Sequence, residues 1–138
     1  MSANDLQATQ NALPLRSPED IVRMRQVVRE QSIGLGFSLV DQTKIVTAAS
    51  ELGRNTIIYG GGGEVEVLPV TEGLRRGLRL VFRDQGPGIA DIALAMKDGY
   101  TSGGGLGLGL GGAKRLSNEF TIDSKPGQGT RITITRWK

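Results

Sequence analysis

An aspartate stands at the end of a strand-like segment and is followed at once by a glycine-rich turn. Asp84 follows residues 78–83, and Gly86 and Gly88 come just after it. Alternate residues of a strand face the same side, so Asp84 shares its side with the apolar side chains of that segment. A carboxylate on that side needs a partner, because burial of an unpaired charge is costly. A purine with an exocyclic amino group would donate the required hydrogen bond; an Asx-type turn that closes the strand is the alternative.

A glutamate and an asparagine stand one helical turn apart in a second segment. Glu51 and Asn55 fall within residues 41–59, where a helix is predicted, so both project from one face. The amide oxygen of Asn55 is a hard, neutral ligand that suits Mg²⁺ bound to phosphates and water. The carboxylate of Glu51 could orient or deprotonate a hydroxyl group or a water molecule. A solvated polar face of the helix would explain the same pair without any chemistry.

Eight of the 21 glycines lie in residues 99–112, which lead into a predicted short helix. Backbone N–H groups without side-chain cover, aimed at a helix N-terminus, form a cradle for anions. Three glycines alternate with leucines and would let phosphates approach closely: Gly105, Gly107 and Gly109. Lys114 and Arg115 add positive charge behind them. The segment is neither a P-loop nor a dinucleotide-binding fingerprint, and leucines such as Leu106 favour a lid over a linker.

A fourth motif, Gly127-Gln128-Gly129-Thr130, closes a turn into the last predicted strand. Considered alone, this motif is typical of a hairpin loop and predicts no chemistry.

Periodicity and turn signals predict the elements that hold these residues. In chain order they are an edge strand at 13–16, helices at 18–33 and 41–59, strands at 64–70 and 78–83, short helices at 91–96 and 112–118, and strands at 119–124 and 130–136. Ser17 and Asp41 are the predicted N-caps of the long helices, and residues 71–77 are predicted to connect two strands. This order indicates a two-layer α/β sandwich with helices on one face of a mixed, mostly antiparallel sheet.

Composition limits the possible classes of protein. The 138 residues predict a flexible tail at 1–12 and a single domain at 13–138. The sequence has no cysteine and no histidine, which excludes disulfides, thiolate metal sites and histidine chemistry. Basic residues are scattered and aromatic residues few, so we expect no nucleic-acid binding. With no long apolar run and no signal-peptide pattern, we expect a cytoplasmic protein without membrane association.

The order of the four motifs resembles the gyrase, Hsp90, histidine-kinase and MutL superfamily, known as GHKL, with its Bergerat fold. The resemblance extends over about residues 13–138. It implies that Asp84 accepts a hydrogen bond from the adenine amino group of ATP and that Gly86 and Gly88 shape the adenine pocket. It also implies that Asn55 coordinates the Mg²⁺ that bridges the phosphates.

The same resemblance assigns the later motifs. It implies that the phosphates are held under a mobile lid by Gly105, Leu106, Gly107 and Gly109. Thr130 would support the adenine end of the pocket beside Asp84. Gly111 departs from the pattern expected after the lid, where proline would stand, and this leaves the stiffness of the lid open.

The longer segments around Asn55, around Asp84 and at residues 98–107 resemble those of the small serine/threonine switch kinases of the stressosome. This similarity implies transfer of the γ-phosphoryl group of ATP to Ser or Thr of STAS-domain proteins, with Glu51 as the general base. It also implies that the kinase, once released, activates a PP2C-type phosphatase. An anti-sigma factor that sequesters a sigma subunit, with ATP gating the choice of partner, is the alternative.

Overall fold

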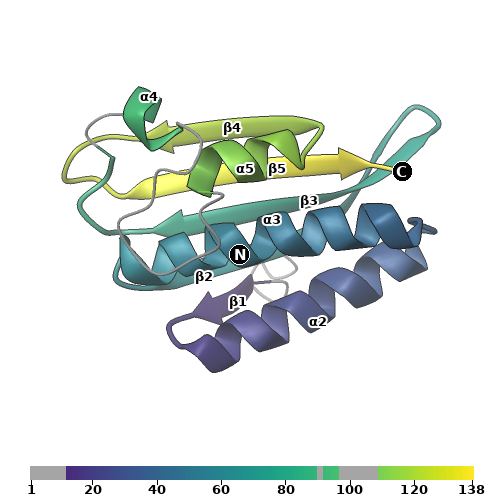
Figure 1. The fold of residues 1–138 in the computed structure, drawn as a ribbon, viewed down its shortest axis with the longest axis horizontal. Coiled ribbons are helices and arrows are strands. Elements are labelled where there is room, and N and C mark those ends of the chain that lie inside the picture. Colours follow the sequence, from purple (N-terminus) through teal and green to yellow (C-terminus); the bar gives the residue numbers. More distant parts are fainter. Residues whose placement is uncertain (1–11, 90–91, 97–108) are drawn as a thin grey trace, which may run out of the picture.

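The computed structural model describes residues 12–89, 92–96 and 109–138. The elements are β1 (Ala12–Leu15), α2 (Pro18–Gly34), α3 (Leu39–Ile58), β2 (Gly63–Glu72), β3 (Arg75–Asp84), α4 (Ile92–Ala95), α5 (Gly109–Arg115), β4 (Glu119–Ser124) and β5 (Thr130–Trp137). They form two layers, with the long helices α2 and α3 running across a sheet (Figure 1). The predicted tail, apart from Ala12, lies outside the described residues.

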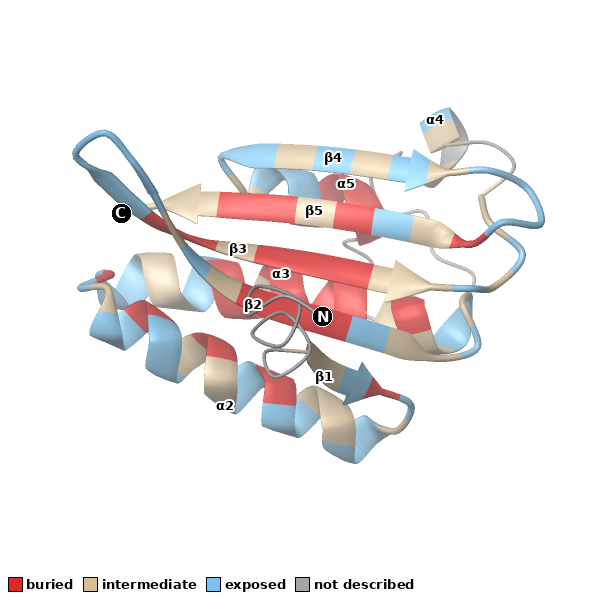
Figure 2. Ribbon diagram, turned by 180° about the vertical axis from the view of Figure 1, so that it is seen from behind, coloured by how far each residue is buried: buried red, intermediate tan, exposed pale blue. Residues whose placement is uncertain are grey.

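The five strands form one sheet in the order β1-β2-β3-β5-β4. Every pairing among the described residues is antiparallel, in agreement with the prediction of a mostly antiparallel sheet; the parallel pairing that a mixed sheet would add is not found among them. Two of the four pairings are hairpins, β2 with β3 and β4 with β5. In Figure 2 the sheet faces the viewer with the helices behind it, and no helix of the described residues covers the near face.

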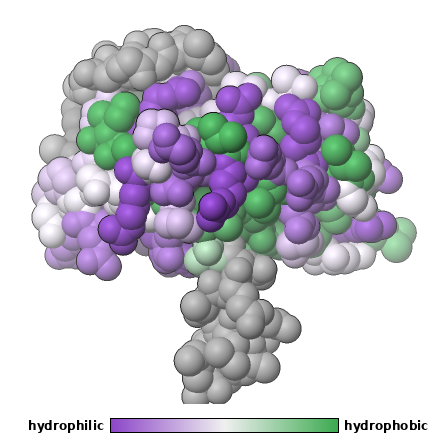
Figure 3. Space-filling model, turned by 90° about the horizontal axis from the view of Figure 1, so that it is seen from below, coloured by the Kyte–Doolittle hydropathy of each residue, from purple (hydrophilic) through white to green (hydrophobic). Residues whose placement is uncertain are grey.

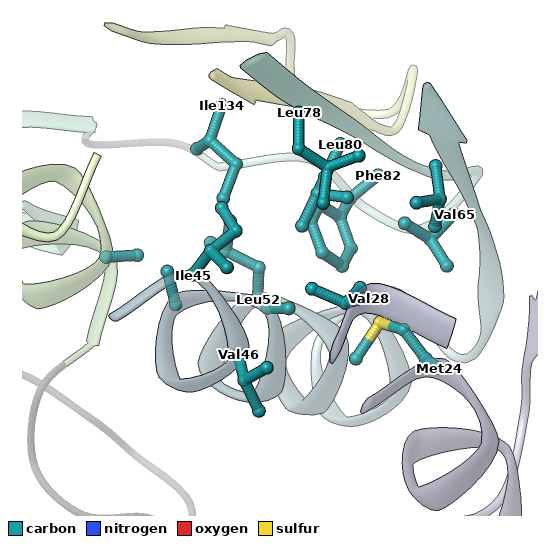
Figure 4. Close-up of a cluster of buried hydrophobic side chains, with 14 of the residues drawn as sticks. Met24, Val28, Ile45, Val46, Leu52, Val65, Leu78, Leu80, Phe82 and Ile134 are labelled. Atoms are coloured by element: carbon teal, nitrogen blue, oxygen red, sulfur yellow. The ribbon is translucent and has the colours of Figure 1, made fainter. Parts of the chain in front are cut away.

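The core fills the space between the sheet and the helices (Figure 4). Leu78, Leu80 and Phe82 of β3 are buried on the helix side, as the alternation of the sequence predicted. They meet apolar side chains from α2 and α3, and the labelled ones include Met24, Val28, Ile45 and Leu52. Because Asp84 follows the same alternation, this packing directs its carboxylate toward the helix layer.

The start of α3 differs from the prediction. The N-cap is Ser38, whose hydroxyl accepts a hydrogen bond from the backbone N–H of Asp41 at 3.1 Å. Asp41 therefore lies inside the first turn, where its carboxylate contacts the guanidinium of Arg136 at 2.7 Å. Arg136 also donates to the carbonyl of Leu116 at 2.9 Å, so it joins β5 to α3 and to the end of α5. Serine and aspartate are both common N-caps, so residue type alone does not choose between Ser38 and Asp41. The ion pair with Arg136 engages the Asp41 carboxylate and leaves the cap to Ser38.

Two further boundaries differ. The hairpin between β2 and β3 turns at Gly73 and Leu74 alone, so the strands extend through most of the predicted connection at 71–77. Gly73 has a φ of 61°, as the first central residue of a type II′ turn requires. The last helix begins at Gly109 rather than at residue 112, so its first residues belong to the glycine-rich segment.

The outer side of α2 mixes hydrophilic and apolar side chains (Figure 3). Val22 and Ile33 are each 56% exposed there, among arginines such as Arg23 and Arg25. Among the described residues, no helix has the length and apolar character that crossing a membrane requires.

The ion pair of Asp41 and Arg136 predicts how stability depends on pH. The hydrogen bond from Arg136 holds the pKa of Asp41 below its usual value of 3.8, against the opposing effect of burial. The pair therefore stabilises the fold above pH 3.8, and this contribution is lost as pH falls through the lowered pKa.

We expect Asp41→Asn to lower the free energy of unfolding at neutral pH and to flatten its acid dependence. Urea unfolding at a series of pH values would measure this. Asp123→Asn is the control, because its ion pair with Arg131 is exposed and should contribute little. Parallel pH profiles for Asp41→Asn and the wild type would contradict the assignment.

Candidate functional site

The carboxylate of Asp84 lies half-buried at the end of β3. Its Oδ1 atom accepts a hydrogen bond from the backbone N–H of Gly86 at 2.9 Å, which is the Asx-type turn that the sequence left open. Its Oδ2 atom accepts no hydrogen bond from the residues that the structure describes. The turn therefore uses one carboxylate oxygen and leaves the other as an acceptor for a ligand.

Glycines from three separate segments close around Asp84. A Cβ atom on Gly60, just after α3, would lie 2.4 Å from Asp84 Cγ. A Cβ on Gly86 would lie 2.7 Å from the Cα of Gly60, and a Cβ on Gly129 would lie 2.3 Å from the Asp84 carbonyl oxygen. No side chain fits at these three points. Gly129 was predicted only as part of a hairpin turn, and Gly60 directly follows the predicted helix at 41–59, so their contact with Asp84 is a finding of the structure.

The turn after β3 is fastened to the hairpin between β4 and β5. Gly88 has a φ of +77°, and a Cβ there would lie 2.2 Å from the carbonyl oxygen of Lys125. The N–H of Gly127 donates to the carbonyl of Pro87 at 2.7 Å. The second glycine of the Asp84 motif is thus required for contact between two backbones, while the first is required for contact with the end of α3.

Thr130 lies beside Asp84, because these two residues are direct partners in the register of β3 and β5. Its hydroxyl oxygen is 2.8 Å from the hydroxyl oxygen of Ser124, its partner on β4. Ser124 Oγ accepts from the backbone N–H of Ile89 at 2.8 Å and lies 3.1 Å from the carbonyl of Gly129. Ser124 was missed in the sequence, although the pairing of the predicted hairpin places it opposite Thr130.

Glu51 and Asn55 lie on the last turns of α3. Glu51 is only 4% exposed, and its Oε1 atom accepts a hydrogen bond from the guanidinium of Arg54 at 2.8 Å. Asn55 is half-buried, and its side-chain amide makes no hydrogen bond to any described residue. Gly60, which packs against Asp84, follows Asn55 by five residues, or about 7.5 Å at the rise of a helix. Glu51 and Asn55 therefore lie on the part of α3 that leads to Asp84. Burial of Glu51 argues against the solvated polar face that the sequence left open.

Arg54 is a second residue that sequence reasoning missed. It follows Glu51 by three positions, the spacing at which a helix brings two side chains together, and this spacing was the signal that could have found it. Its side chain is 34% exposed while that of Glu51 is 5% exposed. The buried carboxylate is therefore paired with a cation that reaches it from the surface, as burial of a charge requires.

Only part of the glycine-rich segment can be placed. Gly105, Leu106 and Gly107 lie outside the described residues and stay predictions. Gly109 is buried and opens α5 with a φ of 59°, and α5 packs on α3. Lys114 and Arg115 form the last turn of α5, so they lie at the end of the helix away from the glycines.

The described residues include no group of three or more carboxylates that could enclose a metal ion. A divalent cation here would take Asn55 as a protein ligand and fill its other positions from phosphates and water, as Mg²⁺ commonly does. The amide of Asn55 is half-buried and has no hydrogen-bond partner among the described residues, which fits that use.

Comparison with known proteins identifies the family of the chain. Residues 40–138 match the family of histidine kinase-, DNA gyrase B- and HSP90-like ATPases. The chain is 44% identical over 128 residues to the serine/threonine-protein kinase RsbT of Bacillus subtilis (strain 168), covering 93% of this chain and 96% of the relative. It is 29% identical to an anti-sigma F factor of Clostridium kluyveri, covering 72% of each.

Two solved structures share the fold. One contains the RsbU and RsbW domains of a Mycobacterium tuberculosis protein, with a TM-score of 0.61 and 22% identity over 91% of this chain and 31% of that chain. The other is the mycobacterial sensor histidine kinase MprB, with a TM-score of 0.54 and 22% identity over 90% of this chain and 95% of that chain. The predicted fold and family resemblance are confirmed.

The hydrogen bonds of Ser124 generate a prediction for the turn after Asp84. We expect Ser124→Ala to speed hydrogen exchange at the Ile89 amide by roughly three- to tenfold, the effect of losing one part-buried hydrogen bond. Native-state exchange followed by NMR would measure this. Ser117→Ala is the matched control, because that hydroxyl bonds within α5 to the carbonyl of Ala113. Unchanged exchange at Ile89 in Ser124→Ala would contradict the role of Ser124.

Proposed function

Because the chain belongs to the family of histidine kinase-, DNA gyrase B- and HSP90-like ATPases, we propose that it is an ATP-dependent serine/threonine protein kinase of the partner-switching type. It transfers the γ-phosphoryl group of ATP to a Ser or Thr hydroxyl of a STAS-domain protein. The observation that carries this proposal is the buried Glu51, held by Arg54 one turn from Asn55 on a helix whose end packs against Asp84.

The adenine of ATP binds at the Asp84 end of the site. The free Oδ2 atom of Asp84 accepts the hydrogen bond of the exocyclic amino group, and Thr130 supports the same end through its bond with Ser124. Gly86 and Gly88 shape the adenine pocket by letting the turn after β3 pack against the end of α3 and against the hairpin between β4 and β5. The phosphates extend toward Asn55 and toward Gly109 at the N-terminal end of α5, and Gly105, Leu106 and Gly107 are the other residues that we propose hold them.

Asn55 is the residue that would hold Mg²⁺, and the cation supplies charge neutralisation for the phosphates when it is bound. The chain's own contribution is a neutral amide ligand at one fixed position on α3, without a hydrogen bond to any residue that the structure describes. A carboxamide suits this role because it adds no negative charge beside the phosphates.

Glu51 acts as the general base. Its carboxylate takes the proton of the substrate hydroxyl as the oxygen attacks the γ-phosphorus, and the bond to the β-phosphate oxygen breaks to release ADP. Arg54 occupies Oε1 and fixes the orientation of the carboxylate, which leaves Oε2 to receive the proton. Arg54 is thus a positioning residue for Glu51.

The partners that we propose are those of a switch kinase. STAS-domain proteins are the substrates, and release from them frees the kinase to activate a PP2C-type phosphatase. The anti-sigma F factor relatives favour a second candidate, in which the chain sequesters a sigma subunit and ATP gates the choice of partner. A STAS-domain protein that becomes labelled by γ-labelled ATP supports the first candidate, whereas a sigma factor retained without labelling supports the second.

The role of Glu51 predicts a separation of binding from catalysis. We expect Glu51→Ala to lower phosphoryl transfer to a STAS-domain protein at least about a hundredfold, within the usual contribution of a general base, while ATP affinity changes little. Labelled-phosphate transfer and calorimetric titration with ATP would measure the two quantities. Glu19→Ala, at an exposed position on α2, is the control. Transfer at the full rate by Glu51→Ala would refute the assignment of the base.

The role of Asp84 predicts the opposite pattern. We expect Asp84→Ala to weaken ATP binding by roughly tenfold or more, because it removes a hydrogen bond to a charged acceptor. The affinity for a fluorescent ATP analogue would report this loss. Asp123→Ala, which removes an exposed carboxylate of β4, should bind the analogue as the wild type does. If Asp84→Ala and the wild type bound the ATP analogue with equal affinity, the proposed contact between Asp84 and adenine would be contradicted.

A further inference from the structure

A polar groove of about 820 Å³ lies at the strand ends, and its lining includes Asp84, Ser124 and Thr130 of the candidate site. On the sheet face opposite the helices, the lining includes one row of residues that the register places side by side: Glu64, Arg83, Arg131 and Asp123. Arg16 and Lys125 also line the groove, and none of the described residues in its lining has an apolar side chain. Pockets for small organic ligands are mostly apolar, so this lining favours a charged ligand. In Figure 2 this face is turned toward the viewer.

Two arginines stand directly opposite each other in the middle of that row. Arg83 and Arg131 are partners in the register of β3 and β5, and like charges in that position repel. Arg83 forms an ion pair with Glu66, and Arg131 forms one with Asp123 at 3.2 Å. The Arg131 and Asp123 side chains are 56% and 66% exposed, so this pair is weak and open to exchange. The Arg83 side chain is 40% exposed, and its partner Glu66 is 10% exposed.

We propose that this groove docks an acidic helix of a protein partner, with carboxylates one turn apart. Directly opposed residues of neighbouring strands have Cβ atoms about 5 Å apart, and side chains a turn apart on a helix are separated by about 5–6 Å. Two such carboxylates can each meet one guanidinium. Arg16 and Lys125 add positive charge to the lining of the groove.

The groove and the nucleotide site share the same strand ends. Arg83 precedes Asp84, Arg131 follows Thr130, and neighbouring residues of a strand face opposite sides. A partner that holds the two arginines therefore restrains the backbone that carries Asp84 and Thr130. Docking and nucleotide binding are linked, and the linkage is reciprocal. This link rests on the proposed function, whereas the docking itself does not.

The test uses the full chain without nucleotide and a fluorescent, alanine-based helical peptide that carries glutamate pairs at i and i+4. We expect this peptide to bind more tightly than a twin with glutamine at the same positions, and binding to weaken as salt is added. We expect Arg131→Gln to weaken binding by roughly two- to fivefold and Arg83→Gln/Arg131→Gln by roughly tenfold or more. Arg25→Gln, on the exposed side of α2, makes the same change of charge and should have no effect.

NMR mapping with the wild-type chain keeps the test independent of the stability of the variants. The glutamate peptide should shift the amides of Arg83, Asp123 and Arg131 and spare those of α2. Equal binding of the two peptides, or an equal loss in Arg25→Gln, would overturn the proposal. Binding of inorganic pyrophosphate at these amides without the peptide would overturn it in favour of a phosphate ligand. A dimer that dissociates in Arg131→Gln would overturn it in favour of a second copy of this chain.

A second experiment tests the linkage to nucleotide binding by repeating the peptide titration with saturating ATP and Mg²⁺. We expect the affinity for the glutamate peptide to change, and an unchanged affinity would overturn the linkage. A chain that bound the peptide but no ATP would contradict the proposed kinase function and leave the docking site standing.

Discussion

The contact between the carboxylate of Asp84 and the backbone of Gly60 is the constraint on which the site depends. A charged group on the core side of a strand must lie against polar atoms or a ligand, because burial without a partner is costly. Here the end of α3 comes so close that a Cβ on Gly60 would lie 2.4 Å from Asp84 Cγ. This contact sets α3 against β3, and thereby fixes where Glu51 and Asn55 stand relative to the carboxylate.

Sequence patterns predicted the parts of this arrangement that depend on local periodicity. The alternation along β3 predicted the side that Asp84 faces, and helical spacing predicted that Glu51 and Asn55 share a face. Local patterns could not predict Gly60, Gly129 or Ser124, because each matters through a contact with a distant segment. The predicted N-cap of α3 was wrong for the same reason. Asp41 lies inside the helix and contacts Arg136, a residue from a distant segment.

The two faces of the sheet carry different chemistry on the same strand ends. Asp84, Thr130 and Ser124 face the helices and are joined by register or by hydrogen bonds. Their immediate neighbours Arg83, Arg131 and Asp123 face away, and residues from both faces line one charged groove at the strand ends. Under the two proposals, a small domain presents a nucleotide and a partner to the same strand ends. Such an arrangement suits a protein that exchanges partners according to its nucleotide, because no separate domain has to move.

The central claim is that Asp84 receives the amino group of adenine, and one comparison of nucleotides tests it most directly. The experiment compares calorimetric titrations of the wild-type chain with ATP and with inosine triphosphate, each with Mg²⁺. The two nucleotides differ at C6, where the amino group is replaced by a carbonyl oxygen, and at N1, which carries a proton in inosine. The account predicts that inosine triphosphate binds at least about tenfold more weakly, a difference of about 1.4 kcal/mol, because its ring offers an oxygen where adenine offers a donor. Equal affinities for the two nucleotides would contradict the account.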